Sequence, residues 1–345
     1  SALGLEVLDP LPSTKKPSLA FVSAPTAGAS YNMVTATQKT ITATVTYERA
    51  MYVATDASAL TLTLNVAGRT RTATYSGISE DRKTLTFTYT LGSSSNDDRG
   101  LSGPVSITAL NGANTVLSDI AGNPAPSGAA SFTGTAPTID TLAPALPIIA
   151  IKDAQADFTS VTSDGAVSIK AEADATVTVT FKNTSDTTKA AQTVVVTGKG
   201  TSASAEEVLA KLSPSQVTAL GQGTIQVTAE AIDAAKNSSG TTIVSSFTLD
   251  TIRPTVNSIS SNTAQLKSGG TATVTFTFSE DPGDSFGVND VTVTGGTLSN
   301  ITGSGLTRTA TFTADTPNLS GQQASITVAA NSYTDAALNT GAGFS

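Results

Sequence analysis

The chain has 345 residues, of which 39% are apolar, 5% aromatic and 13% charged, and it contains no Cys, His or Trp. Without His or Cys it has no imidazole base, Ser/His/Asp triad, thiol nucleophile, thiolate metal site or disulfide. Any metal ligands must therefore be oxygen atoms. With 19 Lys and Arg against 27 Asp and Glu, the net charge is −8 and the pI is near 4.6, which argues against nucleic acid or anionic lipid as a partner.

The sequence also bears on the compartment. No apolar run approaches the roughly 18 residues of a membrane span, and the first residues lack the basic and apolar regions of a signal peptide. We therefore expect no membrane insertion, and a chain that is either cytosolic or already trimmed. An acidic composition rich in Thr, Ser and Gly, with few aromatic residues, is common in long bacterial surface proteins, so we expect an extracellular location on the bacterial cell surface.

Short segments in which apolar and polar residues alternate predict half-buried β-strands. In chain order these are residues 41–47, 60–66, 85–89, 105–110, 167–171, 176–181, 193–196, 224–229, 243–249, 271–278, 291–294, 308–313 and 324–328. Their spacing of about 8 to 15 residues, with Gly, Asn, Asp and Ser between them, argues against βαβ units and favours an all-β antiparallel fold. One helix is expected at residues 204–212, where Ser204 and Glu207 form a capping-box pattern, followed by a turn-like segment at 213–220.

A short motif recurs along the chain with the pattern D-x-x-x-N. It lies at Asp119–Asn123, Asp233–Asn237 and Asp335–Asn339, and its Asp residues follow one another at intervals of 114 and 102 residues. That interval is the length of one β-sandwich domain. A residue that is Gly in the first copy, Gly122, is Lys236 and Leu338 in the other two.

A second marker places the domain boundaries. An Asp followed within a few residues by Pro occurs at Asp140–Pro144 and Asp250–Pro254, and more loosely from Asp9 to Pro17. Pro fixes φ and lacks a donor, which suits an extended linker that enters a first strand. We expect a strand or linker of a preceding or neighbouring domain at residues 1–9, and sandwich domains at 10–139, 140–249 (with the helix as a crossover) and 250–345, the last lacking its final strand.

A third marker is a Glu at the end of an early strand in each expected domain. In a sandwich, the start of the first strand, the end of the second and the loop between the last two lie at one pole, so these markers converge there. The three sets are Asp9, Glu48, Asp119 and Asn123; Asp140, Glu172, Asp233 and Asn237; and Asp250, Glu280, Asp335 and Asn339. Clustered carboxylates repel one another unless a cation intervenes, and Ca²⁺ takes six to eight such oxygen ligands. The alternative interpretation is that Asp and Asn are ordinary turn residues and the Glu is simply solvated.

Several segments resemble the bacterial Ig-like repeat domains of large secreted adhesins and of biofilm and surface-layer proteins. They are Thr273–Glu280, Asp290–Ser299, Ala219–Ala229 and the turn at Asp233 and Asn237 followed by Asp250–Pro254. The resemblance implies tandem Ig-like antiparallel β-sandwich domains arranged end to end, with Ca²⁺ at the junctions. It also implies a non-enzymatic extender whose partners are neighbouring Ig-like domains.

Two alternatives remain open from the sequence. Residues 1–8 resemble the last strand of an absent domain, so the chain is either a fragment of a longer array or a self-assembling filament or surface-layer subunit that donates this strand to another copy. The first domain has an added loop at Asn96–Arg99 and a group of tyrosines (Tyr47, Tyr52, Tyr75 and Tyr89), which leaves an adhesin module that binds a surface glycan or host protein as the other alternative.

Overall fold

The computed structural model describes residues 16–22, 30–34, 39–92, 97–126, 135–201, 204–242, 244–316, 321 and 323–345. The expected strand at residues 1–8 and the site residue Asp9 lie outside these ranges. The chain divides into two compact units. The first consists of Ser1–Leu146, Asp174–Thr176 and Ala231–Gly240, and the second consists of Pro147–Ala173, Val177–Glu230 and Thr241–Ser345.

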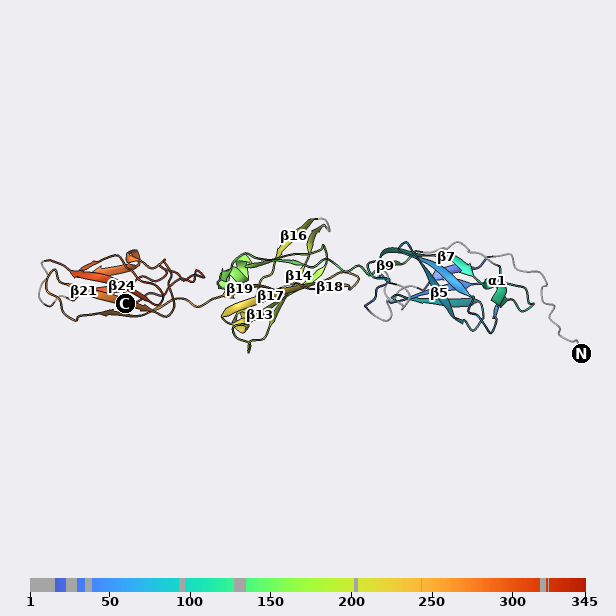
Figure 1. Ribbon diagram of the computed structural model, residues 1–345, viewed down its shortest axis with the longest axis horizontal. Coiled ribbons are helices and arrows are strands. Elements are labelled where there is room, and N and C mark those ends of the chain that lie inside the picture. The colour runs from blue at the N-terminus through green and yellow to red at the C-terminus, as the bar shows by residue number, and fades with distance from the viewer. Residues whose placement is uncertain are drawn as a thin grey trace, which may run out of the picture. The chain divides into compact units, whose positions relative to one another are not determined.

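Residues 16–140 form a seven-stranded antiparallel sheet with the order β1-β2-β6-β5-β4-β7-β9, and β3 pairs with β8 beside it (Figure 1). The elements are β1 Ser18–Phe21, β2 Thr40–Thr46, β3 Tyr52–Val53, β4 Thr61–Val66, β5 Arg69–Ile78, β6 Thr84–Thr90, β7 Ser102–Asn111, α1 Ala113–Val116, β8 Leu117–Ser118 and β9 Thr138–Asp140.

The register of this sheet explains why the alternating pattern folds as it does. In the pair β2–β6, Ala43 lies opposite Phe87 with both side chains buried, whereas Thr42 lies opposite Thr88 on the other face. The apolar face packs into one core with Leu62, Leu64 and their neighbours. Threonine suits the outer face because its branched side chain packs well on a pleated surface.

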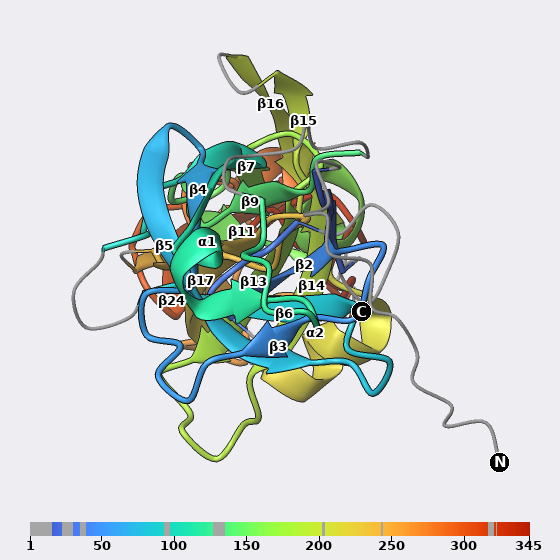
Figure 2. The ribbon, with the colours of Figure 1, turned by 90° about the vertical axis from the view of Figure 1, so that its right-hand side faces the viewer.

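Residues 147–249 contribute two further sheets, ordered β10-β12-β16-β15 and β11-β19-β17-β13-β14, with β18 paired to β17. The elements are β10 Ile148–Ile151, β11 Gln155–Ala156, a π-helical turn Ser160–Asp164, β12 Val167–Lys170, β13 Thr176–Asn183, β14 Gln192–Thr197, β15 Lys199–Thr201, β16 Ser204–Leu209, α2 Pro214–Leu220, β17 Gly223–Ile232, β18 Ser238–Thr241 and β19 Ser245–Leu249. β12 pairs with Glu207–Leu209 of β16, and the rest of β16 pairs with β15 in a hairpin (Figure 2).

Residues 250–345 form a four-stranded sheet, β20-β21-β24-β23, and a two-stranded sheet, β22-β25. The elements are β20 Val256–Ser261, β21 Thr271–Phe278, a 3₁₀ turn Val288–Asp290, β22 Val291–Thr294, β23 Gly296–Leu298, β24 Thr307–Ala314 and β25 Ser325–Val328. Phe276, Phe278, Phe286 and Tyr333 pack edge to face in the core, with ring centroids 4.8–5.8 Å apart. At the end of the chain, Phe344 and Val328 exchange two backbone hydrogen bonds of 2.8 and 3.0 Å.

The expected all-β antiparallel fold is confirmed, but the expected helix is misplaced. Residues 204–209 form strand β16, and the helix is α2, which begins one residue after Ser213. Ser213 and Gln216 form its capping box, and Pro214 occupies the first turn. The helix-favouring Ala, Glu and Leu of residues 205–209 are overridden because the first half of this segment pairs with β15 and the second half with β12.

Candidate metal centre

The three D-x-x-x-N loops have the same backbone geometry. In each loop, the N–H of the Asp donates to the carbonyl oxygen of the Asn, at 2.9 Å in the first loop, 3.1 Å in the second and 3.2 Å in the third. The backbone N–H of each Asn donates in return to Oδ1 of its Asp, at 2.9–3.0 Å. Each Asn side chain also donates from Nδ2 to Oδ2 of the same Asp, at 2.9–3.0 Å. The repeated motif is therefore a self-closed loop in which the carboxylate caps backbone and side-chain N–H groups.

The residue before each Asn has a left-handed backbone. Its φ is 83° at Gly122, 72° at Lys236 and 67° at Leu338. Only glycine adopts this region without steric cost, so Lys236 and Leu338 have a backbone conformation that favours glycine. The backbone of the loop is left-handed at this position whether or not the residue is glycine.

In two loops the Asn also fixes the linker that precedes its strands. Asn339 Nδ2 donates to the carbonyl oxygen of Asp250 at 2.9 Å, and Asn237 Nδ2 donates to that of Asp140 at 3.2 Å. The Asp–Pro marker and the D-x-x-x-N marker are thus in direct contact in these two places. In this arrangement the amide nitrogen of the Asn donates a hydrogen bond that joins the loop to the linker.

Around the third loop, Asp250, Glu280 and Asp335 each place one carboxylate oxygen within 4.8 Å of the others. Asp250 follows β19, Glu280 lies just after β21, and Asp335 belongs to the loop. Asp335 is buried, while the other two are half-buried. Among the described residues, this is the group of three acidic side chains with a spacing that could hold a metal ion.

The carboxylate of Glu280 is poorly compensated at this place. Its Oε1 is buried and has no hydrogen-bond partner. Burial, together with the charges of Asp250 and Asp335, raises the pKa of Glu280 from 4.5 to about 7. Asp335, in contrast, accepts hydrogen bonds from Ala337 N and from Asn339. The cluster therefore lacks positive charge at Glu280, which is where a cation would be most favourable.

The second set of predicted residues is distributed differently. Asp140, Asp233 and Asn237 belong to the first unit, whereas Glu172 belongs to the second unit and is half-buried. Burial and, to a smaller extent, the charge of Asp233 raise the pKa of Asp140. A metal at this set stays a prediction.

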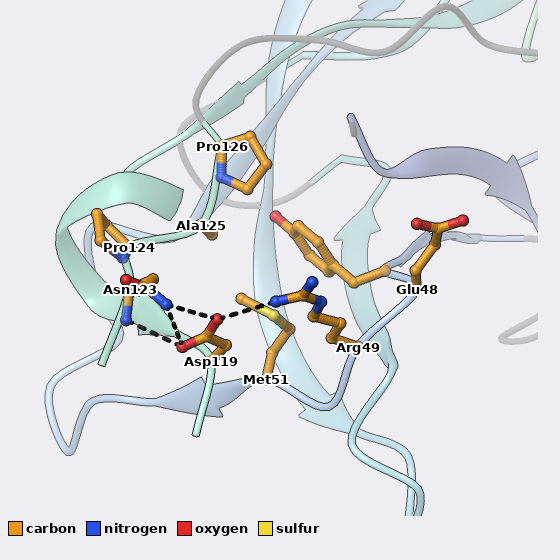
Figure 3. Close-up of a pocket in the computed structure, with 9 residues that line it drawn as sticks. Glu48, Arg49, Met51, Asp119, Asn123, Pro124, Ala125 and Pro126 are labelled. Atoms are coloured by element: carbon orange, nitrogen blue, oxygen red, sulfur yellow. Dashed lines mark hydrogen bonds and ion pairs between the residues drawn. The ribbon is translucent and has the colours of Figure 1, made fainter. Parts of the chain in front are cut away.

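At the first loop a basic side chain lies beside the acidic ones. Figure 3 shows the guanidinium of Arg49 directed towards Asp119, while the carboxylate of Glu48 is directed away from Asp119. Arg49 Nη1 lies 3.7 Å from Asp119 Oδ2. The hydrogen bond from Asn123, with a smaller contribution from Arg49, lowers the pKa of Asp119.

Arg49 was not among the residues singled out from the sequence. Its position directly after Glu48 was a signal, because the residue after a strand-end Glu lies at the same pole. The pocket beside it is lined by Glu48, Arg49 and Asp119, and also by Tyr47, Met51 and the segment Asn123–Pro126. The hydroxyl of Tyr47 is buried there without a hydrogen-bond partner, and burial raises the pKa of Tyr47 to about 12.

The other candidate binding features of the first unit are mainly structural. Tyr47 and Tyr89 are buried and Tyr75 is half-buried, so of the four tyrosines Tyr52 alone is exposed, and Arg82 stacks on its ring at 4.3 Å. In the added loop, Asp98 is fully buried and accepts hydrogen bonds from Arg71, Tyr89 and the backbone of Gly92. That carboxylate anchors the loop to the sheet.

None of the helices among the described residues has the length and apolar character needed to span a membrane. Comparison with curated protein sequences gives no match. Among solved structures, a 1.5-MDa bacterial ice-binding adhesin, reported for its host cell surface retention, is similar at 18% identity over 94% of this chain and 93% of that chain, with a TM-score of 0.32.

Native α2-macroglobulin of Escherichia coli, domains MG0-NIE-MG1, is similar at 11% identity over 90% of this chain and 96% of that chain, with a TM-score of 0.21. Surface layer protein SbsC, domains 1–6, is similar at 13% identity over 92% of this chain and 53% of that chain, with a TM-score of 0.18. TM-scores this low do not establish a shared function.

The family comparison is more specific. Residues 250–345 match the family described as "Bacterial Ig-like domain". This segment contains two of the stretches that carried the resemblance in the sequence, Thr273–Glu280 and Asp290–Ser299. The acidic cluster of Asp250, Glu280 and Asp335 thus belongs to this segment, and residues 250–345 are a bacterial Ig-like domain.

Proposed function

We propose that this chain is a non-enzymatic structural segment of a bacterial cell-surface protein, an extender or adhesin segment built from Ig-like domains. The family match at residues 250–345 supports this role. So does the repetition of one loop geometry three times along the chain, which is typical of tandem structural domains. Without His or Cys, the sequence offers few groups for nucleophilic or acid–base chemistry.

We further propose that Asp250, Glu280 and Asp335 bind Ca²⁺. The observation that carries this proposal is the unpartnered Oε1 of Glu280 beside two other carboxylates. Carboxylate oxygens are the ligands that Ca²⁺ prefers, and it accepts the irregular geometry that a loop and two strand ends provide. When bound, the ion supplies the positive charge that these three groups lack.

Ca²⁺ at this place would connect the chain before the domain to the domain itself. Asp250 lies in the linker between β19 and β20, whereas Asp335 lies in a loop near the end of the domain. Asn339 already joins the same two segments through one hydrogen bond to Asp250. An ion that binds only when both segments are in place stabilises that arrangement by mass action.

The test compares the full chain in excess Ca²⁺ and in EDTA by calorimetry and small-angle X-ray scattering. We expect Ca²⁺ to raise the melting temperature and to narrow the distribution of molecular lengths. Glu280→Gln and Asp335→Asn should lose most of this response. Asp284→Asn is a matched control, because Asp284 is an exposed carboxylate in the loop that follows Glu280. Melting and dimensions that are the same in Ca²⁺ and EDTA would contradict the proposal.

A further inference from the structure

We propose that the first D-x-x-x-N loop carries its own cation, the guanidinium of Arg49, and does not take Ca²⁺. This inference compares the first loop with the third. It rests on the proposed function in one respect, because it assigns Ca²⁺ to the third loop and not to the first. It differs from the sequence prediction, which placed Ca²⁺ at Asp9, Glu48, Asp119 and Asn123 as well; Asp9 lies outside the described residues. The difference arises from one side chain at the strand end.

The first and third loops share the same pattern of hydrogen bonds. Asp119 and Asp335 each accept hydrogen bonds from the backbone of the residue two positions later and from the following Asn. In each loop the Asn side chain donates to Oδ2 of its Asp, at 3.0 Å. A difference in metal binding must therefore come from what surrounds the loops.

The residue after the strand-end Glu differs in charge between the two places. In the first unit it is Arg49, whose guanidinium lies against Asp119 and stands between that carboxylate and Glu48 (Figure 3). In the C-terminal domain it is Asp281, which pairs with the buried Arg308 at 2.9 Å. Within the described part of the chain, Asp119 forms an ion pair, whereas Asp250, Glu280 and Asp335 form none.

The carboxylates are compensated differently at the two places. Asp119 accepts hydrogen bonds from Asn123 and pairs with Arg49, so its ionised form is already stabilised by the protein. Oε1 of Glu280 is buried without a hydrogen-bond partner, beside Asp250 and Asp335, so its ionised form is not. A divalent ion at Asp119 would have to displace or approach Arg49, and the repulsion between the two cations opposes binding. The described residues at the first loop therefore do not fit Ca²⁺.

The experiment uses hydrogen–deuterium exchange of the full chain, in Ca²⁺ and in EDTA, read at residues 117–125 and 330–340. The variants are Arg49→Gln, which removes the charge, and Arg49→Lys, which keeps it. Arg99→Gln is the matched control, because Arg99 is an exposed arginine of the same unit that also pairs with one Asp, at 2.9 Å.

In the unmodified chain we expect Ca²⁺ to slow exchange at residues 330–340 and to leave residues 117–125 unchanged. In Arg49→Gln, exchange at 117–125 should become faster in EDTA by several-fold and should slow again on addition of Ca²⁺. Arg49→Lys and Arg99→Gln should behave like the unmodified chain at 117–125.

Two results would overturn the inference. One is protection of residues 117–125 by Ca²⁺ in the unmodified chain. The other is an Arg49→Gln variant whose residues 117–125 are the same as in the unmodified chain under both conditions. If Ca²⁺ protects neither region of the unmodified chain, the Ca²⁺ assignment at the third loop fails, while the response of Arg49→Gln still decides the role of Arg49.

Discussion

Lys236 and Leu338 occupy left-handed positions that favour glycine, and the stability of their loops should reflect this. A side chain in this region costs roughly 1–2 kcal/mol, while a glycine loses more entropy on folding. Both side chains are exposed, so little packing is lost with them. We expect Lys236→Gly and Leu338→Gly each to raise the free energy of unfolding by about 0.5–1 kcal/mol, measured by urea denaturation at pH 7.

The first loop supplies the reciprocal control. Gly122 has the same positive φ with no neighbouring atom within 4 Å of a Cβ built on it, so an alanine there meets backbone strain but no clash. Gly122→Ala should therefore lower the free energy of unfolding by about 1 kcal/mol. If all three variants had the same stability as the unmodified chain, the backbone of these loops would relax from the left-handed conformation when a side chain is present.

At the scale of single residues, the sequence predicted which Asp and Asn residues recur, but it did not predict what they contact. Repetition identified Asp119, Asp233 and Asp335, because one geometry needs one residue type at the same place. It did not indicate that each carboxylate is largely engaged by its own loop. The direction of a side chain such as Glu48 depends on neighbours distant in sequence, and a pattern does not contain that information.

At the scale of strands and helices, alternation predicted the strands that bury one face. β2, β6 and β21 have buried residues at every second position, as their sequences indicated. β5 was missed because its sequence, Arg69–Ile78, is mostly polar and Ala73 is its one fully buried residue. It is a strand because β4 and β6 pair with it on both sides, and because Ala67 and Gly68 form a two-residue hairpin turn with positive φ.

The loop that contains Asp233 depends on a residue far away in the sequence. Asn32 is fully buried in the first unit, donates from Nδ2 to the carbonyl oxygen of Ala235 at 2.6 Å and accepts from Val34 N at 2.9 Å. Asn32→Ala removes both bonds and leaves a buried carbonyl unpaired, which typically costs about 1–3 kcal/mol. We expect faster hydrogen exchange at residues 231–240 and a lower melting temperature.

The control for this change is a second asparagine that bonds only within its own turn. Asn65 is exposed and accepts from Gly68 N at 2.8 Å in the β4–β5 hairpin. Asn65→Ala should leave exchange at residues 231–240 unchanged. If Asn32→Ala also leaves it unchanged, the loop is held by its own hydrogen bonds and by those from Asn237 to the linker, without a contribution from Asn32.

At the scale of the whole molecule, stability near neutral pH depends on carboxyl groups with raised pKa values, of which the described residues include two. They are Asp140 in the first unit and Glu280 in the C-terminal domain. Several other carboxyl groups, such as Asp97 and Asp119, have lowered pKa values, and their effect on stability is confined to acidic pH. Among the described carboxyl groups, Glu280 therefore dominates the response near neutral pH, because its pKa is about 7.

Without metal, the pH dependence of the stability of the folded chain follows from the raised pKa of Glu280. Its pKa is about 7 in the folded chain and 4.5 as a free side chain, so the folded chain binds more protons between these values. Stability in EDTA should then fall as the pH rises through this window, by on the order of 1–2 kcal/mol once the solvent around this half-buried group is allowed for. Glu280→Gln should remove most of that fall. Ca²⁺ should reverse the trend in the unmodified chain, because it binds the ionised carboxylates and so gains affinity as the pH rises.

Melting temperatures at half-unit steps from pH 5 to 8, in EDTA and in Ca²⁺, measure both slopes. A flat profile in EDTA that Glu280→Gln does not change would show that the charge of Glu280 is already compensated within the protein, and the cluster would then have no electrostatic reason to bind a metal.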